Sequence, residues 1–223
     1  MEASTLVRSR SKALLSVYAV IGFGLAIGCA WLFTLLADEV PEQGWMAHLD
    51  AAVMSWLELH STEGGESIFV AVSLLGEQLL WPVLVAAGIV LARRRDWRRF
   101  ALFAVASGGG ALLNVALKLS FQRARPMFAT EFSLRSWSFP SGHAMVSLIC
   151  YGLLAWWLAS EHPSQKHWIY GAAALLVVAI GFARVYLGVH YVSDVFAGYC
   201  AGFVWLTVCI TGYRVASNRS PLP

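Results

Sequence analysis

The chain alternates long apolar runs with short polar segments, and most of the runs have the length of a membrane span. A transmembrane helix needs about 20 consecutive, mainly apolar residues. Several segments approach or exceed that length: 13–37, 68–92, 100–120, 140–159, 168–187 and 192–213. Glu77 and Pro82 interrupt the second of them. The pattern predicts an all-α polytopic membrane protein with six transmembrane helices, organised as a single domain over residues 1–223.

The polar segment between the first two runs holds a shorter amphipathic pattern. Within residues 44–60, apolar side chains recur at helical spacing, at Trp45, Leu49, Ala52, Val53, Trp56 and Leu59. This spacing predicts a short amphipathic helix that lies in the membrane interface, in the first outer loop. Such a helix can act as a lid or lipid gate, or it can be a passive float anchored by its tryptophans. The sequence leaves both interpretations open.

Composition agrees with a membrane protein. Hydrophobic residues make up 58% of the chain and charged residues 13%, compared with about 45–50% and about 25% in soluble domains. A soluble globule of this size could not bury so much apolar surface. The first run, 13–37, is too long for the apolar part of a signal peptide, which has about 7–15 residues. We therefore expect it to remain as the first span.

The distribution of Lys and Arg predicts the orientation of the chain. An even number of spans places both termini on one side, and that side carries 11 of the 16 Lys and Arg residues. Cytoplasmic loops are the basic ones, so both termini are expected in the cytoplasm. The net charge of +3 is too small to indicate nucleic acid binding. The first outer loop has no Lys or Arg, yet the outer side gathers Lys118, Arg123, Arg125, Arg135 and Arg184 near helix ends. This arrangement predicts an anion site on the outer face.

A first candidate segment lies at the end of the third span. Lys118 and Arg125 are seven positions apart, so their side chains share one face of a helix. Pro126 disfavours helix for the residue before it. Arginine can donate two parallel hydrogen bonds to a phosphate, and lysine adds a positive charge on a flexible side chain, so this pair suits a phosphate. Two cations at a helix end can also simply extend to the interface, without binding a ligand.

A second candidate segment, Pro140 to His143, opens the fourth span. Proline suits the first turn of a helix, and the N–H groups at a helix start bind anions. Gly142 lets an anion approach the backbone closely, and Ser141 can add a hydroxyl donor. His143 is placed to protonate a leaving oxygen. An ordinary capped helix with an interfacial histidine is the alternative.

A third candidate segment joins the fifth and sixth spans. His190 and Asp194 are four positions apart, so on a helix the carboxylate reaches the imidazole. A carboxylate that accepts a bond from one ring nitrogen fixes the tautomer and leaves the other nitrogen free to attack. Arg184 lies outside the face of His190 in a continuous helix, and Gly188 supplies a break that can bring both into one site. A purely structural His–Asp pair is the alternative.

The predicted topology brings all three segments to the outer face, and together they resemble the type 2 phosphatidic acid phosphatase superfamily. The signature of that family reads K-x6-R-P, then P-S-G-H, then S-R-x5-H-x3-D. The chain matches its order and spacing from Lys118 to Asp194. Ala183 stands where the family usually has serine, which removes one possible hydroxyl ligand and puts affinity in question more than activity.

The resemblance implies a role for each residue of the motifs. His190 is the nucleophile and forms a phosphohistidine, Asp194 orients it, and His143 protonates the leaving oxygen and then activates water. The phosphate oxygens are held by Lys118, Arg125, Ser141, Gly142 and Arg184. The resemblance implies no metal and no other cofactor. Soluble vanadium haloperoxidases share the signature, but six spans argue against that branch.

The substrate is expected to be a lipid phosphate or diphosphate in the membrane. The resemblance implies a protein of a bacterial cytoplasmic membrane with its active site on the outer face. Bacterial relatives of this type act on undecaprenyl diphosphate, phosphatidylglycerophosphate, phosphatidate or lipid A phosphate, and an outward-facing site favours the first of these. Two alternatives remain open: a lipid phosphotransferase with the same phosphohistidine, and an anion or lipid transporter without chemistry. The sequence does not indicate an oligomeric state.

Overall fold

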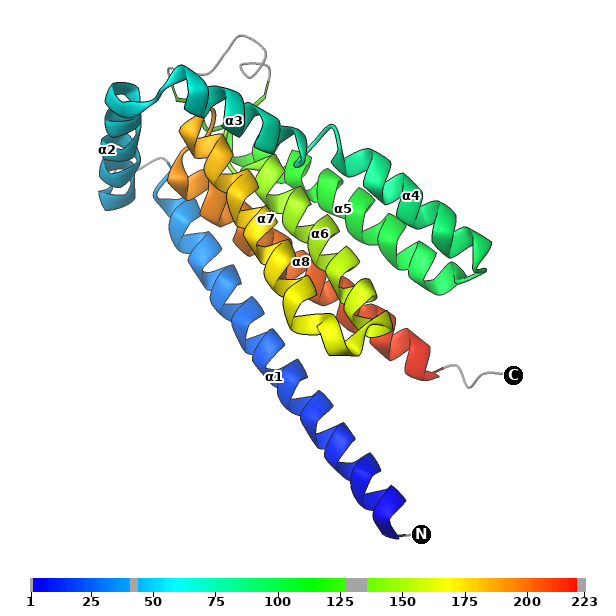
Figure 1. Ribbon diagram of the computed structural model, residues 1–223. Helices are drawn as coiled ribbons and strands as arrows, with labels where there is room; N and C mark the ends of the chain where they lie inside the picture. Colours follow the sequence, from blue (N-terminus) through cyan, green and yellow to red (C-terminus); the bar gives the residue numbers. More distant parts are fainter. Residues whose placement is uncertain (1, 41–43, 127–135, 220–223) are drawn as a thin grey trace.

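The computed structural model describes residues 2–40, 44–126 and 136–219 of the chain, and the expected all-helical fold is confirmed across them (Figure 1). No strand occurs in these residues. The helices are α1 (Glu2–Asp38), α2 (Trp45–His60), α3 (Glu63–Leu74), α4 (Leu80–Arg93), α5 (Trp97–Phe121), α6 (Gly142–Glu161), α7 (Lys166–Tyr186) and α8 (Val192–Arg219), with a short 3₁₀ turn at Pro163–Gln165.

Five apolar helical segments of the described chain are long enough to cross a membrane: Val20–Asp38, Trp97–Phe121, Gly142–Glu161, Pro163–Tyr186 and Val192–Ser217. The run expected as the second span forms two helices instead, α3 and the shorter apolar α4. The helix is interrupted between Leu74 and Leu80, in the segment that contains Glu77. Pro82 causes no break because it lies in the first turn of α4, where its missing N–H costs no hydrogen bond.

Helix α6 is the centre of the bundle and packs against α5, α7 and α8. Two glycines of α8 allow α6 to approach closely. A Cβ atom at Gly198 would lie 2.6 Å from the carbonyl oxygen of Ser141, and one at Gly202 would lie 2.8 Å from that of Met145. The start of α6 is therefore held directly against the first turns of α8, which carry Asp194.

Helix α2 lies beside the end of the bundle at which α1 ends and α3 begins (Figure 1). The expected helix over 44–60 is present, and its two faces differ. One face is buried against the protein through Met46, Asp50, Met54 and Leu57. The other exposes apolar side chains, at Trp45, Leu49, Trp56 and Leu59. The apolar stripe seen in the sequence is therefore the outward face, and the buried face contains a carboxylate.

Candidate active site

The three motif segments meet at one end of the bundle, where α5 and α7 end and α6 and α8 begin. The connection from α7 to α8 depends on Gly188, whose φ of 62° lies in the left-handed region that favours glycine. The break expected there is present. It allows Arg184 at the end of α7 and His190 before α8 to belong to one site although a continuous helix would separate them.

The His190–Asp194 pair forms as its spacing predicts. Nδ1 of His190 lies 3.3 Å from Oδ2 of Asp194, and both residues are buried. Asp194 also accepts hydrogen bonds from the backbone N–H of Tyr191, at 2.9 Å, and from the hydroxyl of Ser138. The carboxylate is thus fixed by contacts on several sides.

The partners of His190 assign its tautomer. Nε2 lies 3.2 Å from Nη1 of Arg125, and a guanidinium can only donate hydrogen bonds. Nε2 is therefore the unprotonated nitrogen, and Nδ1–H faces Asp194. Burial, opposed by Asp194, lowers the pKa of His190 to about 3. The imidazole is neutral at physiological pH, with its lone pair on Nε2, as a nucleophile requires.

Arg123 joins the Asp194 carboxylate to helix α2. Its Nη1 donates to Asp194 at 2.7 Å and its Nη2 donates to Asp50 at 2.9 Å. The guanidinium lies 4.1 Å from the centre of the Tyr191 ring. Burial acts to lower the pKa of Arg123, but the charges of Asp194 and Asp50 outweigh it and the pKa is raised. Asp50 also accepts the backbone N–H of Ser193 at 3.1 Å, near the start of α8.

This network bears on the two interpretations of α2. Helix α2 is tied to the site by the ion pair between its buried Asp50 and the partly buried Arg123, a contact that a helix anchored only by its tryptophans would not need. In the sequence, Arg123 is only one of the outer cations and Asp50 only one of several acids in the loop. The signal that could have identified Asp50 was its position, because it lies on the side of α2 opposite the exposed tryptophans.

Lys118 lies in the last turn of α5, whereas Arg125 lies beyond the helix, which ends at Phe121, so the two side chains do not share a helix face as expected. Both donate to backbone carbonyl groups. Nζ of Lys118 lies 3.4 Å from the carbonyl oxygen of Ser138. Arg125 donates to the carbonyl oxygens of Ser136 and Val189 at 2.9 and 2.7 Å. Together with Arg184 they are close enough to repel one another, so a phosphate among them would relieve that repulsion. The fifth outer cation, Arg135, lies outside the described residues.

The second motif folds differently from expectation at one position. Helix α6 begins at Gly142, with Ser141 as the capping residue, so Pro140 precedes the helix instead of forming its first turn. The chain is held there by a hydrogen bond of 2.9 Å from the Ser141 N–H to the carbonyl oxygen of Asp194. A Cβ atom at residue 142 would lie 2.9 Å from Oδ1 of Asn114. Close packing therefore requires Gly142 here, and Asn114 is a neighbour that the sequence did not reveal.

The hydroxyl of Ser141 is a candidate donor to a ligand. Its Oγ is buried and has no hydrogen-bond partner among the described residues. The side chain does not cap its own helix. A buried hydroxyl without a partner is costly, and a phosphate oxygen would satisfy it. The same holds for Nε of Arg184, which is also buried without a partner in the described chain.

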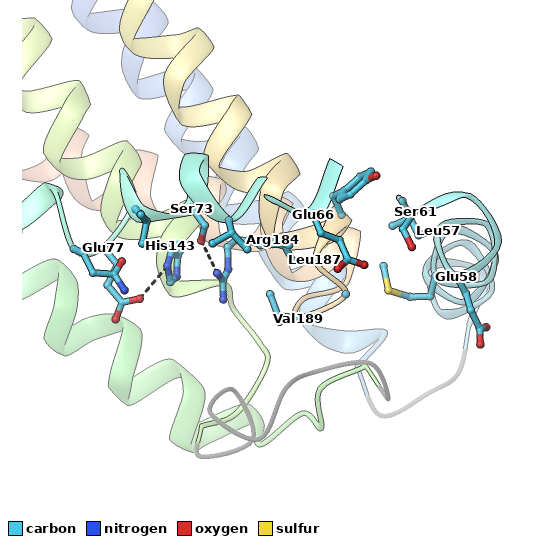
Figure 2. A pocket seen from close by; sticks show the side chains of 16 residues that line it. Leu57, Glu58, Ser61, Glu66, Ser73, Glu77, His143, Arg184, Leu187 and Val189 are labelled. Carbon is cyan, nitrogen blue, oxygen red and sulfur yellow. Dashed lines mark hydrogen bonds and ion pairs between the residues drawn. The ribbon is translucent and has the colours of Figure 1, made fainter. Parts of the chain in front are cut away.

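His143 and Arg184 line a cavity of about 830 Å³ between α2, α3 and the end of α7 (Figure 2). Nε2 of His143 lies 3.0 Å from Oε2 of Glu77, and Nη1 of Arg184 donates to the hydroxyl of Ser73 at 2.6 Å. Ser73, Glu77, His143 and Arg184 lie together near the start of α6 (Figure 2). Toward α2 the lining is mixed, with the apolar side chains Met54 and Leu57 beside Glu58, Ser61 and Glu66.

His190 does not line this cavity. Its neighbours Gly188 and Val189 do, and Arg125 covers its Nε2. A phosphoryl group that reaches Nε2 must therefore take the place of the Arg125 contact. The displaced guanidinium can then donate to the phosphate oxygens.

Comparison with known proteins identifies the family. Residues 99–217 match the model of the PAP2 superfamily. This chain belongs to the PAP2 superfamily. The three motifs lie within the matched residues. Glu77, Ser73 and Asp50, which the structure adds to the site, lie before them.

Individual PAP2 relatives agree with this assignment. Phosphatidylglycerophosphatase B of Bacillus subtilis (strain 168) is 34% identical over 179 residues, which cover 78% of this chain and 88% of that protein. Undecaprenyl-diphosphatase of Sulfolobus acidocaldarius is 25% identical over 139 residues, covering 60% and 64%. The fold is similar to the crystal structure of the transmembrane PAP2-type phosphatidylglycerolphosphate phosphatase from Bacillus subtilis, with a TM-score of 0.79 and 28% identity over 88% of this chain and 98% of that one. The resemblance drawn from the motifs is confirmed, and the chain is a membrane lipid phosphatase of the PAP2 type.

Proposed function

We propose that this PAP2 phosphatase removes the terminal phosphate of undecaprenyl diphosphate and of phosphatidylglycerophosphate or phosphatidate, with His190 as the nucleophile. The observation that carries the proposal is the His190–Asp194 pair. Its contacts place an unprotonated Nε2 at 3.2 Å from Arg125, among cations that suit a phosphate. The Bacillus subtilis relative is a phosphatidylglycerophosphatase and the Sulfolobus acidocaldarius relative an undecaprenyl-diphosphatase, which supports the choice of lipids.

The reaction proceeds in two steps at this site. Nε2 of His190 attacks phosphorus, an N–P bond forms, and the bond from phosphorus to the lipid oxygen breaks. His143 transfers a proton to that departing oxygen. Water then gives a proton to His143 and attacks phosphorus, the N–P bond breaks, and inorganic phosphate leaves.

The phosphate oxygens carry the developing charge, and the site offers donors to each of them. Lys118, Arg125 and Arg184 supply positive charge, while the Ser141 hydroxyl and the Gly142 N–H supply neutral donors. Such preorganised donors stabilise a phosphoryl transition state without further rearrangement. Nucleophile, acid and charge stabilisation all come from side chains and backbone, and this supports a reaction without a metal or another cofactor.

The membrane arrangement follows from the same features. We assign α3 and α4 together to the second of six membrane passes, with the break at Glu77 near the outer face. The exposed apolar face of α2 then lies in the outer interface, and both termini lie in the cytoplasm with the basic loops. The apolar side chains in the cavity lining, among them Met54, Leu57 and Val70, are suited to contact the part of the lipid next to its phosphate.

Phosphate release by the purified protein in detergent tests the proposal. We expect release from undecaprenyl diphosphate and phosphatidylglycerophosphate, and its loss in His190→Ala. His167→Ala, at an exposed position at the start of α7, is the matched control and should remain active. Release that requires an added lipid acceptor would indicate a phosphotransferase. No phosphate transfer by the wild-type protein to water or to any acceptor would contradict the proposal.

A further inference from the structure

A second imidazole–carboxylate pair lies in the cavity, formed by His143 and Glu77. The two side chains approach to 3.0 Å, between Nε2 and Oε2 (Figure 2). His143 lies in the first turn of α6. Glu77 lies in the break between α3 and α4. The pair therefore joins segments that are far apart in the sequence.

The fold holds the break against His143. A Cβ atom at Gly76 would lie 2.6 Å from Cγ2 of Ile180 and 3.1 Å from Cδ2 of His143, so only glycine fits this approach without a shift of these side chains. The hydroxyl of Tyr151 donates to the carbonyl oxygen of Leu75 at 2.6 Å. The turn that carries Glu77 is thus fixed to α6 on one side and to α7 on the other.

We propose that Glu77 is the positioning residue of the general acid. It accepts the Nε2–H of His143 and so directs Nδ1, the other ring nitrogen, toward the departing lipid oxygen. This inference rests on the proposed function, because it assigns His143 the proton transfer of the first step.

Charge supports the same role. The groups that face His143 are Glu77 from the break, Arg184 from α7 and Arg125 from the segment after α5. Burial and the two arginines disfavour a protonated imidazole at His143, and Glu77 favours it. A general acid must carry its proton when the substrate binds, so the carboxylate offsets the cost of the arginines that hold the phosphate.

The inference makes Glu77 a determinant of which lipids react well. When a phosphate monoester is cleaved, the departing group is an alcohol oxygen, a strong base that needs a proton as it leaves. When a lipid diphosphate is cleaved, the departing group is itself a phosphate, a much weaker base. Help from the acid is therefore worth more for the monoester than for the diphosphate.

Two substrates with the same acyl chains test this difference: phosphatidate and diacylglycerol diphosphate. A general acid contributes about 10²–10⁴-fold, so Glu77→Gln should lower kcat/KM for phosphatidate by about 30–100-fold and for the diphosphate by less than about 5-fold. We use kcat/KM because it reports the steps up to departure of the lipid. The second step is common to both substrates, so any effect on water activation should lower kcat for both alike.

Two further variants separate positioning from structure. Glu63→Gln, an exposed acid at the start of α3, should leave both substrates unaffected. Glu77→Asp keeps the charge and should restore part of the phosphatidate activity. In Glu77→Gln the alkaline limb of the phosphatidate profile should move to lower pH, because His143 loses its proton more readily.

The outcomes are distinguishable. Equal losses of kcat/KM on both substrates, or no loss on either, would overturn the role of Glu77. If Glu77→Gln does not fold, the same ratio measured in Glu77→Asp decides the matter. A wild-type protein inactive on both lipids would instead refute the proposed function.

Discussion

The two histidines of the site have carboxylate partners in opposite settings. His190 and Asp194 lie one helical turn apart and are almost completely buried, and several contacts fix the carboxylate. His143 and Glu77 come from distant segments, and their side chains are 14% and 58% exposed at a cavity. A nucleophilic imidazole must stay neutral and keep one tautomer, and burial of His190 beside Asp194 favours both. An acid that later becomes a base must exchange protons, which requires access to water.

The strongest test of this comparison removes the buried histidine. His190→Ala removes Nε2, the nitrogen that bonds to phosphorus in the proposed mechanism. Loss of a nucleophile typically costs at least about 10⁴-fold in kcat, and we expect that loss on monoesters and diphosphates alike. Phosphate release in detergent measures it. A residual activity that still discriminates between the two lipids would mean that another residue is the nucleophile.

The next largest effect should come from the buried carboxylate. Asp194→Asn would favour the wrong tautomer of His190, and the corresponding change in a Ser–His–Asp triad lowers kcat by about 10⁴-fold. We expect a loss of about 10³–10⁴-fold in kcat by analogy with that triad, again independent of the leaving group. Comparison with Glu77→Gln is the control, because only the exposed pair should show a dependence on the leaving group. If Asp194→Asn showed such a dependence, the roles of the two pairs would have to be reassigned.

A smaller effect is expected from Asp50, which links α2 to the buried pair through Arg123. Asp50→Asn should lower kcat on the order of tenfold, less than the roughly 10²-fold that a misplacement of about 1 Å can cost. It should also lower the unfolding temperature in detergent, because a buried guanidinium loses a charged partner. Asp38→Asn, at an exposed position of α1, is the control. An unchanged kcat in Asp50→Asn would show that α2 is only a structural cover.

The smallest effect is expected from removal of metals. Both pairs act by nucleophilic attack and proton transfer, and the charges on the phosphate are met by Lys118, Arg125 and Arg184. Excess EDTA should therefore leave turnover of both lipids unchanged. Loss of activity in EDTA, restored by a divalent cation, would mean that the cationic side chains do not suffice.

Local patterns predicted the part of the site that depends on local geometry. The His190–Asp194 contact follows from a four-residue spacing across the start of α8. The helical fold follows from the length of the apolar runs. The sequence also placed interruptions at Glu77 and Pro82, but it could not tell that only the first breaks the helix. That outcome depends on where α4 begins relative to the proline.

Contacts between distant segments could not be predicted in the same way. Glu77 meets His143, and Asp50 meets Arg123, only because the α3–α4 break and the buried face of α2 pack against the bundle. Pro140 was expected inside the first turn of α6. Its actual place depends on the hydrogen bond from Ser141 to Asp194, which lies more than 50 residues away in the chain.

The most direct test of the account is to locate the phosphoryl group during turnover. A His143→Asn variant mixed with a lipid diphosphate labelled in its terminal phosphate should accumulate an acid-labile phosphoenzyme, because departure of the lipid needs little help while water activation is lost. Peptide mapping should then find the label on His190. A label on any other residue, or no phosphoenzyme while the wild type and the variant still release labelled phosphate, would contradict the central claim.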